Sequence, residues 1–454
     1  MSIQKVIKNG FCIGCGACKV ISPEAIELKF YDGIYNAEIV KKEKLSILAT
    51  KVCPFSDDSI NETELITTIN SYNQSENIGQ YTKIYTGGVM SETDRELSSS
   101  GGMTSWVMSK LLKEGYVDSI IHVTEAGEGK FQFSIAKTES ELVSGRKSKY
   151  YPVTMSEILN ELDTTTTYAI TGVPCFIKSI SLLQKQGLYK NIKFKLALFC
   201  GHFKTSYFSE MLSWELGVEP SKISNVDFRK KVKGHAASDY FVEITDKSGS
   251  VKQGRISEMF GTNWAHGLFK PQACDFCDDI CGELADVTFG DAWLPEYTNN
   301  WLGTNIVISR NEIIDKIIAL GLTNAEVSLN EVSEDDVVKS QAANFRHRRG
   351  GIISRINTLS LNWYPKKRLN LCEEHYDESR NYLYKQRWDL AKESGKFFLH
   401  AKNKGKYFYF KFPMYIKVVG YDIKNNGLKY VVKSEIRKRI AKLIRVLGIR
   451  KGVK

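Results

Sequence analysis

The sequence predicts a protein of the α+β and α/β classes in three parts: a small cysteine-rich module, a mixed α/β body and a basic helical tail. Three observations support this. Cysteines gather near the N-terminus and again before residue 282, apolar runs alternate with amphipathic stretches from residue 81 to about 344, and lysine and arginine dominate after residue 400. With 454 residues, the chain is long enough for two or three structural units.

The first part, residues 1–60, is predicted to fold around a metal cluster. Cys12, Cys15 and Cys18 have the C-x2-C-x2-C spacing that supplies three of the four thiolates of a [4Fe-4S] cluster. Cys53, which precedes a proline, is the expected fourth ligand and follows an apolar segment and an Asp32-Gly33 turn. This unit is therefore predicted to be a ferredoxin-like module that depends on its metal for folding.

The module is expected to hold one cluster and not two. In bacterial ferredoxins with two clusters the first run continues to a further cysteine before a proline, but here Ser22 occupies that position. A second cluster would also need cysteines where the chain has Glu43, Ser46 and Ala49. A zinc site is the alternative, although such sites usually pair two C-x2-C motifs.

The central part predicts alternating strands and helices. Residues 61–80 are polar and predict a short helix and a linker, with a boundary near residue 80. Beyond it, periodicity predicts strands over 83–89, 119–123, 131–136, 168–171 and 193–199, and helices over 103–114, 155–162 and 176–186. Short strands over 226–228, 240–245, 251–253 and 286–290 make the later half more strand-rich, which favours an α+β arrangement there.

A second group of cysteines follows these strands. Cys274, Cys277 and Cys281 supply three thiols in eight residues, and a cluster or a zinc ion needs a fourth from elsewhere. Cys175 and Cys200 both follow predicted strands, whose loops gather at one edge of a sheet. Inert buried cysteines are the alternative interpretation. The sequence thus predicts a second metal centre with its ligand set still open.

At these residues the chain resembles the family of coenzyme F420 hydrogenase/dehydrogenase beta subunits, to which 7-hydroxymethyl chlorophyll a reductase is related. The resemblance covers about residues 1–345. The motifs that carry it are Ser100-Gly101-Gly102-Met103-Thr104, Ser148-Lys149-Tyr150, Thr171-Gly172-Val173-Pro174-Cys175, Phe199-Cys200-Gly201, and Cys274-x2-Cys277 leading into Ala285-Asp286-Val287-Thr288-Phe289-Gly290-Asp291-Ala292-Trp293.

The resemblance implies a division of the chain and a flavin cofactor. It implies a flavin-binding part over residues 81–165, a C-terminal-like part with the second cysteine group over 166–345, and a basic helical extension over 346–454 outside the family. It also implies FAD, in preference to FMN, beside a [4Fe-4S] cluster. Cys175, Cys200, Cys274 and Cys277 match the recurring cysteines of the family, whereas spacing alone favours Cys281, so both Cys200 and Cys281 stay candidates.

The residues themselves give physical support to a flavin site. The loop of Ser100, Gly101, Gly102 and Thr104 opens a predicted helix, whose backbone amides and dipole suit a phosphate. A plain helix cap is the alternative. The Lys149-Tyr150 pair could neutralise a pyrophosphate and cover a ring, although a solvated charged loop has the same composition.

These features predict an iron–sulfur flavoprotein oxidoreductase. A flavin joins one-electron to two-electron chemistry, so electrons are expected to pass between a ferredoxin or other redox partner, the two clusters, the flavin and an unidentified substrate. Nothing in the residues identifies F420 as that substrate. The stretch from Asp291 to Tyr297 resembles bacterial members associated with surface-polysaccharide gene clusters, which suggests a glycan-linked substrate. A non-catalytic electron-transfer subunit and a zinc-stabilised scaffold are the rival hypotheses.

Charge and hydropathy locate the chain and its contacts. The net charge is +11, yet residues 401–454 alone contribute +14, so residues 1–400 are slightly acidic and argue against nucleic-acid binding. The sequence has neither an export signal nor a long apolar stretch, and its cysteines suit a reducing compartment, so we expect a cytoplasmic protein. The basic tail, with an amphipathic pattern from Val432 to Leu447, predicts peripheral contact with the inner membrane surface or a docking helix, against a plainly solvated helix.

Overall fold

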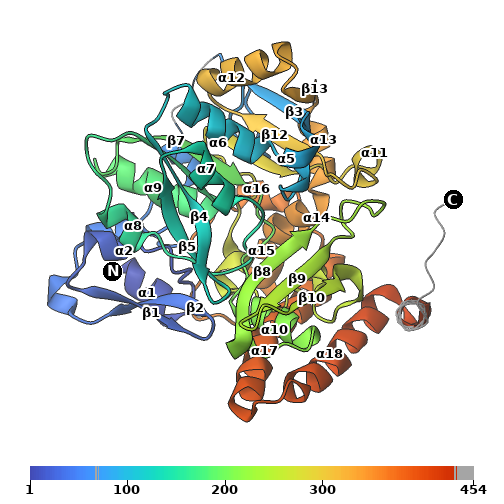
Figure 1. Cartoon of the computed structure of the whole chain (residues 1–454). Helices are drawn as coiled ribbons and strands as arrows, with labels where there is room; N and C mark the ends of the chain where they lie inside the picture. Colours follow the sequence, from blue (N-terminus) through green and yellow to red (C-terminus); the bar gives the residue numbers. More distant parts are fainter. Residues whose placement is uncertain (67–68, 70, 434–435, 437–454) are drawn as a thin grey trace.

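The computed structural model describes residues 1–66, 69, 71–433 and 436. It confirms the predicted mixture of classes: a small N-terminal hairpin unit, a large mixed sheet with a smaller sheet beside it, and a helical C-terminal part (Figure 1). The strands are β1 Ile26–Tyr31, β2 Ile34–Ile39, β3 Lys83–Val89, β4 Ser119–Gly127, β5 Lys130–Ala136, β6 Tyr168–Gly172, β7 Ile192–Leu198, β8 Ile223–Lys230, β9 Phe241–Asp246, β10 Val251–Arg255, β11 Val287–Asp291, β12 Asn305–Ser309 and β13 Val327–Glu331.

Helices connect and cover these strands. The α-helices are α1 Ser2–Lys8, α2 Ala17–Ile21, α3 Leu48–Lys51, α4 Glu62–Leu65, α5 Glu92–Glu96, α6 Met103–Lys113, α7 Glu139–Leu142, α8 Ser156–Asn160, α9 Pro174–Lys185, α10 Tyr207–Glu215, α11 Pro295–Thr298, α12 Glu312–Thr323, α13 Glu334–Ser340, α14 Ala342–Phe345, α15 Gly351–Thr358, α16 Asn370–Glu373, α17 Asn381–Lys404 and α18 Phe408–Asn426. Among the described residues, no helix has the length and apolar character needed to cross a membrane.

The large sheet is parallel at its centre and antiparallel at both edges. Its strand order is β13-β3-β12-β11-β7-β6-β4-β5. The strands β4, β6, β7 and β11 run parallel to their neighbours in that group, whereas β5, β12, β3 and β13 pair antiparallel. Parallel strands place their carboxyl ends at one edge, and the segments that carry Cys175 and Cys200 begin there, after β6 and β7.

Alternation along the strands buries both faces of this sheet. Ile120 and Ala169 point to the face covered by α6 and α12, whereas their neighbours Ile121 and Ile170 point to the face covered by α9. Successive strand residues face opposite sides, so two neighbouring apolar residues require cover on both. The result is a three-layer body, as Figure 1 shows around β7.

The N-terminal hairpin forms where the sequence predicts a turn. Tyr31 pairs with Ile34, and the two residues between them, Asp32 and Gly33, have φ angles of 52° and 75°. Two consecutive positive φ angles make the turn that matches the twist of a tight hairpin, which confirms the predicted Asp32-Gly33 turn. The turn also contacts the body, because the Ser206 amide donates to the Gly33 carbonyl at 2.7 Å.

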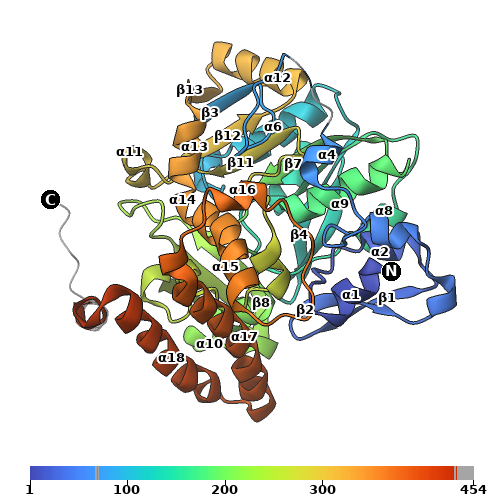
Figure 2. The ribbon, with the colours of Figure 1, turned by 180° about the vertical axis from the view of Figure 1, so that it is seen from behind.

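The C-terminal part is packed into the body and is not a free extension. A π-helical turn, Arg346–Gly350, joins α14 to α15, and it buries Arg348 and Arg349. Seen from behind, α15, α16 and α17 lie across the body, and α18 follows α17 along the lower edge (Figure 2). Most of the amphipathic pattern predicted from Val432 to Leu447 lies outside the described residues.

Candidate metal centres

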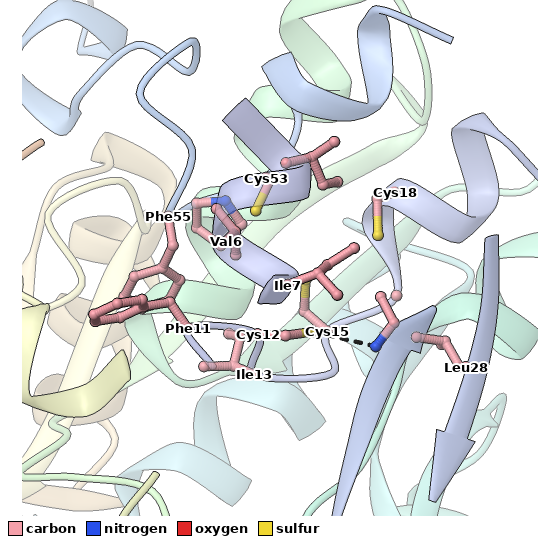
Figure 3. A pocket seen from close by; sticks show the side chains of 14 residues that line it. Val6, Ile7, Phe11, Cys12, Ile13, Cys15, Cys18, Leu28, Cys53 and Phe55 are labelled. Carbon is pink, nitrogen blue, oxygen red and sulfur yellow. Dashed lines mark hydrogen bonds between the residues drawn. The ribbon is translucent and has the colours of Figure 1, made fainter. Parts of the chain in front are cut away.

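The first cysteine group surrounds one pocket. Cys12 and Cys15 lie on the loop before α2, Cys18 lies in α2, and Cys53 follows α3. All four side chains line a single pocket whose other walls are mainly apolar, and their sulfur atoms are drawn in Figure 3. The structure thus brings together the four residues that the sequence proposes as ligands of one cluster.

The surroundings of these thiols suit a bound cluster. The amides of Gly14 and Ala37 both donate to the Cys12 sulfur at 3.4 Å, and amide–sulfur hydrogen bonds are typical of iron–sulfur ligands. Burial raises the pKa of Cys15 to about 11, and burial together with the neighbouring thiols raises the pKa of Cys18 well above its ordinary value. Buried thiols of this kind become thiolates readily only with a cation among them, so the donor set fits a metal cluster.

The second group gathers from three separate segments. Cys175 begins α9, Cys200 follows β7, and Cys274 and Cys277 lie on the turn after the small sheet. Burial raises the pKa of Cys175 well above its ordinary value, and the thiols of Cys277, Cys200 and Cys274 raise it further. Burial likewise raises the pKa of Cys274 to about 12, with Cys200 and Cys277 among its neighbours. These four thiols lie within electrostatic reach of one another.

Cys281 lies apart from this group. Its side chain is fully buried in a different apolar cluster, beside Ile280 and Ile308. Burial raises its pKa, and the neighbouring charges that affect it most are those of Asp279, Arg349, Arg310 and Glu283. Cys277 belongs to another apolar cluster, so the C-x3-C spacing does not place the two side chains together. Of the two candidates for the fourth thiol, the structure brings Cys200 to the group.

Arg348 is a cation in direct contact with the second group. Its Nε donates to the Cys277 carbonyl at 2.8 Å, and its Nη1 donates to the carbonyls of Cys200 at 2.9 Å and Gly201 at 2.6 Å. Its charge lowers the pKa of the Cys274 and Cys277 thiols, against the larger raising effect of burial. In the sequence Arg348 falls within a polar extension, and the run of basic residues from 346 to 349 is the one signal of its position.

The two groups are neighbours. The Cys15 thiol of the first group acts on the pKa of Cys175 in the second, and the Ser179 hydroxyl, one helical turn after Cys175, hydrogen-bonds to Cys15. Phe11, next to Cys12, meets Phe276, next to Cys277, with ring centroids 5.4 Å apart. Such contacts leave a short path through packed protein between the groups.

The four thiols of the first group stand around a pocket. In the described part of the chain, no three His, Cys, Asp or Glu side chains converge closely enough to hold a single metal ion. A tetrahedral zinc ion holds its sulfurs at about 2.3 Å, whereas a cube of iron and sulfide spreads its four thiolates farther apart.

The predicted phosphate loop is closely packed. A Cβ added to Gly101 would lie 2.6 Å from the Gly87 carbonyl oxygen and 2.9 Å from the Asn305 amide nitrogen. The close packing of the backbone is therefore sufficient to require a glycine at this position. The Ser100 hydroxyl donates to the Thr304 carbonyl at 3.0 Å, and the Met103 amide donates to the Asn305 side chain at 3.0 Å. Gly102 adopts the left-handed conformation as N-cap of α6, and Thr104 is half-buried in its first turn.

The Lys149-Tyr150 segment lies against the same loop. The Ser148 amide donates to the Ser99 hydroxyl at 2.6 Å, which joins the two segments. The ring centroids of Tyr150 and Trp264 lie 5.0 Å apart, and those of Trp264 and His202 lie 4.6 Å apart. His202 follows Cys200 by two residues in the chain. Burial lowers the pKa of both Lys149 and His202. The predicted flavin residues are therefore linked by contact to the second cysteine group.

One buried polar atom in this region suits a bound ligand, and one lysine holds the neighbouring loops in place. The His202 Nε2 atom is buried and has no hydrogen-bond partner among the described residues. The Lys231 ammonium donates to three carbonyls, those of Arg95, of Ser100 at 2.8 Å and of Leu302 at 2.5 Å. Burial and then the nearby Arg229 lower its pKa to about 7. Lys231 could not be predicted from the sequence, because nothing distinguishes it from its basic neighbours Lys230 and Lys233.

The chain is similar in sequence to proteins of a known family. Residues 84–160 match the N-terminal part, and residues 165–335 the C-terminal part, of the family described as coenzyme F420 hydrogenase/dehydrogenase, beta subunit. The chain is 23% identical over 330 residues to an F(420)H(2) dehydrogenase subunit of Methanosarcina mazei, an alignment that covers 69% of this chain and 83% of that protein. A chain of the F420-reducing [NiFe] hydrogenase complex from Methanosarcina barkeri aligns with 65% of this chain and 99% of its own length, at 15% identity and a TM-score of 0.49.

The fold and the site define an electron-transfer protein of the oxidoreductase class. More particularly, the chain belongs to the family of coenzyme F420 hydrogenase/dehydrogenase beta subunits, as its motifs predicted.

Proposed function

We propose that this chain is an iron–sulfur flavoprotein oxidoreductase that relays electrons between a ferredoxin-type carrier and an unidentified substrate. The observation that carries the proposal is the placement of four thiols around one pocket, in contact with the second cysteine group through the Phe11 and Phe276 rings, whose centroids lie 5.4 Å apart. Two [4Fe-4S] clusters would be held by Cys12, Cys15, Cys18 and Cys53, and by Cys175, Cys200, Cys274 and Cys277. FAD would bind where the Ser100–Thr104 loop meets Lys149 and Tyr150.

Each part of the site has a separate task in this proposal. Bound clusters supply one-electron transfer, and a bound flavin supplies the change between one-electron and two-electron transfer. The apolar pocket around the first group keeps water away, and Arg348 compensates negative charge at the second. The unpartnered His202 Nε2 could donate a hydrogen bond to a ligand that reaches the Trp264 ring.

A second candidate is a non-catalytic subunit that passes electrons to a partner enzyme. The name of the similar Methanosarcina mazei protein favours it, since that protein is one subunit of a dehydrogenase. Turnover of a substrate by the purified chain with artificial electron donors would exclude this candidate.

The proposed setting is a reducing compartment, the cytoplasm. All ten cysteines are free thiols in the structure, as metal ligands require. A glycan-linked substrate in surface polysaccharide synthesis stays a proposal that rests on the sequence of residues 291–297 alone. Within that stretch Asp291 forms an ion pair with Arg229 at 2.8 Å, which gives it a structural task.

Anaerobic purification with counts of iron, sulfide and flavin tests the proposal. About eight irons and one flavin per chain are expected. Cys200→Ser should lower the count to about four irons, whereas Cys281→Ser, a matched change of a buried cysteine, should keep about eight. Four irons in the unaltered protein, or a loss in Cys281→Ser and not in Cys200→Ser, would contradict the proposed ligand sets.

A lysine variant tests the flavin position separately. Lys149→Gln should lower the flavin content without changing the iron content, because it removes a cation from the proposed pyrophosphate site. The exposed Lys137→Gln is the matched control, and the released flavin is identified as FAD or FMN by chromatography. Unchanged flavin content in Lys149→Gln would place the cofactor elsewhere.

A further inference from the structure

Helix α18 has two apolar faces. On the inner face Phe410 and Met414 are fully buried, and the Phe410 ring lies 5.3 Å from Phe269 and 5.2 Å from Phe398. On the other face Phe408 and Phe412 are 64% and 53% exposed. A surface helix normally has one apolar stripe, which faces the core. A second, exposed apolar stripe indicates a surface that binds another molecule.

The outer stripe is continuous. Phe408, Phe412 and Ile416 follow one another at intervals of four residues, which places them on one line of the helix, and the two phenylalanine rings stack at 5.3 Å. Ile416 is 57% exposed. The stripe is extended by further exposed apolar side chains on and after α18, which are Tyr409, Tyr415, Ile423, Leu428, Tyr430 and Val432.

Positive charge borders this stripe. Between residues 405 and 433 the chain carries six lysines. Lys411 and Lys417 form ion pairs with Glu215 and Glu393 of the body, so the lysines left for the outer surface are Lys406, Lys424, Lys429 and Lys433. Asp422 is the one acidic residue in that range, and it turns inward to His266 at 3.1 Å. The outer surface therefore combines aromatic rings with ammonium groups on long apolar stems, a combination that suits the headgroup region of an anionic bilayer.

We propose that the outer face of α18, continued by Leu428 to Val432, rests on an anionic membrane surface with the helix axis parallel to the bilayer. The charge pattern favours a membrane over a protein partner, because one bilayer offers both apolar depth and negative charge along the whole stripe. The inner face fixes α18 to the body, so the stripe is presented on a rigid support. In both views the C-terminal end of α18 and the N-terminal module lie on opposite sides of the body (Figures 1 and 2), so a carrier can reach the module.

Co-sedimentation of the full chain with vesicles tests the proposal. The probes are vesicles of phosphatidylcholine alone and vesicles that contain about one third phosphatidylglycerol. The chain should bind the anionic vesicles at least about tenfold more strongly, since each lysine near the surface contributes roughly a fivefold change. Raising the salt from about 0.05 to about 0.5 M should weaken binding, because it shortens the reach of the charges.

Matched variants locate the contact. Replacing Phe408, Phe412 and Ile416 together by serine should weaken vesicle binding about tenfold or more, with iron content and thermal unfolding unchanged. The control replaces three other exposed apolar residues, Val143, Val251 and Leu320, by serine and should bind as the unaltered chain does.

Three outcomes would overturn the proposal. The unaltered chain does not bind anionic vesicles at low salt, or the α18 variant binds as well as the control does. In the third outcome, the unaltered chain is a dimer in solution and the α18 variant a monomer, so that a second copy covers the stripe. Cofactor counts are independent of all three, so a failure here is distinguishable from a failure of the proposed function.

Discussion

The guanidinium of Arg348 lies where a cluster on the second cysteine group would carry negative charge. It donates to carbonyl groups of Cys200, Gly201 and Cys277. Because these bonds reach the backbone of the ligand segments, the residue both positions them and adds charge. A fixed positive charge near a cluster favours its reduced form.

Arg348→Gln should therefore lower the reduction potential of the second cluster. We expect a fall of about 60 mV, which is a tenfold change in a one-electron equilibrium. A redox titration followed by electron paramagnetic resonance measures it. Arg348→Lys keeps the charge and should shift the potential less, and the exposed Arg346→Gln is the matched control. An equal shift in Arg346→Gln would show that distant charge, and not this contact, sets the potential.

His122 makes the free energy of unfolding depend on pH in the acid range. It is 2% exposed, its Nδ1 has no hydrogen-bond partner among the described residues, and burial lowers its pKa to about 4. An unfolded histidine keeps a pKa near 6.5, so between pH 6.5 and 4 the unfolded chain binds a proton that the folded chain does not. The free energy of unfolding therefore falls as the pH drops through this range.

Replacing His122 should remove part of that acid sensitivity. We expect His122→Gln to make the loss of stability between pH 6.5 and 4 smaller by about 2–3 kcal/mol, whatever its effect at neutral pH. Urea unfolding at a series of pH values measures it. Parallel stability curves for His122→Gln and the unaltered chain would contradict the prediction.

At the scale of elements, the two faces of α18 should contribute unequally to the free energy of unfolding. Phe410→Ala should reduce the free energy of unfolding by about 3–5 kcal/mol, because it removes a ring packed among Phe269 and Phe398. Phe412→Ala, two residues on and exposed, should change it by less than about 0.5 kcal/mol. Thermal or urea unfolding of the two variants compares the faces directly. Equal costs would mean that the outer face is also packed.

Much of the element order could be predicted from the sequence, because strong periodicity marks the long elements. The predicted strand over 83–89 coincides with β3, and the predicted helix over 103–114 with α6 Met103–Lys113. The sequence does not predict the strands β12 Asn305–Ser309 and β13 Val327–Glu331, and β13 mixes apolar and polar residues. Their pairing with β3 is a long-range contact that no local pattern reveals.

The candidate site was predictable where its ligands are close in sequence. The first cysteine group follows from its spacing, whereas the second draws Cys175 and Cys200 from loops that only the sheet brings together. The sequence left Cys200 and Cys281 as alternatives because the spacing of cysteines does not show where their side chains point. In the structure the Cys281 side chain packs in a different apolar cluster from that of Cys277. Arg348 and Lys231 could not be singled out because a buried cation looks like a surface one in sequence.

At the scale of the molecule, buried charges connect the C-terminal part to the second cysteine segment. Arg368 donates from Nε to Asp278 at 3.0 Å and from Nη1 to Glu283 at 2.7 Å, and all three side chains are buried. The chain from 346 to 368 thus closes over the segment that carries Cys274 and Cys277. Although it lies beyond the residues matched by the family, this stretch completes the site.

Breaking this contact should be costly. Arg368→Met leaves two carboxylates buried without their main partner and should reduce the free energy of unfolding by about 3–5 kcal/mol. The same variant should lose iron from the second group before the first on gentle warming. Lys366→Met, which changes an exposed cation two residues earlier, is the control. Equal effects of the two variants on unfolding would contradict the structural account.

The rings of Phe11, Phe276 and Trp363 form an apolar contact between the N-terminal module and the body, and this contact limits how the two parts can separate in evolution. Phe11 belongs to the N-terminal module, and its ring centroid lies 5.4 Å from that of Phe276 and 5.5 Å from that of Trp363. A gene fission after residue 60 would leave apolar rings facing water on both products. We therefore expect the module to be passed on together with its body, and a descendant that has lost it to carry polar residues in place of Phe276 and Trp363.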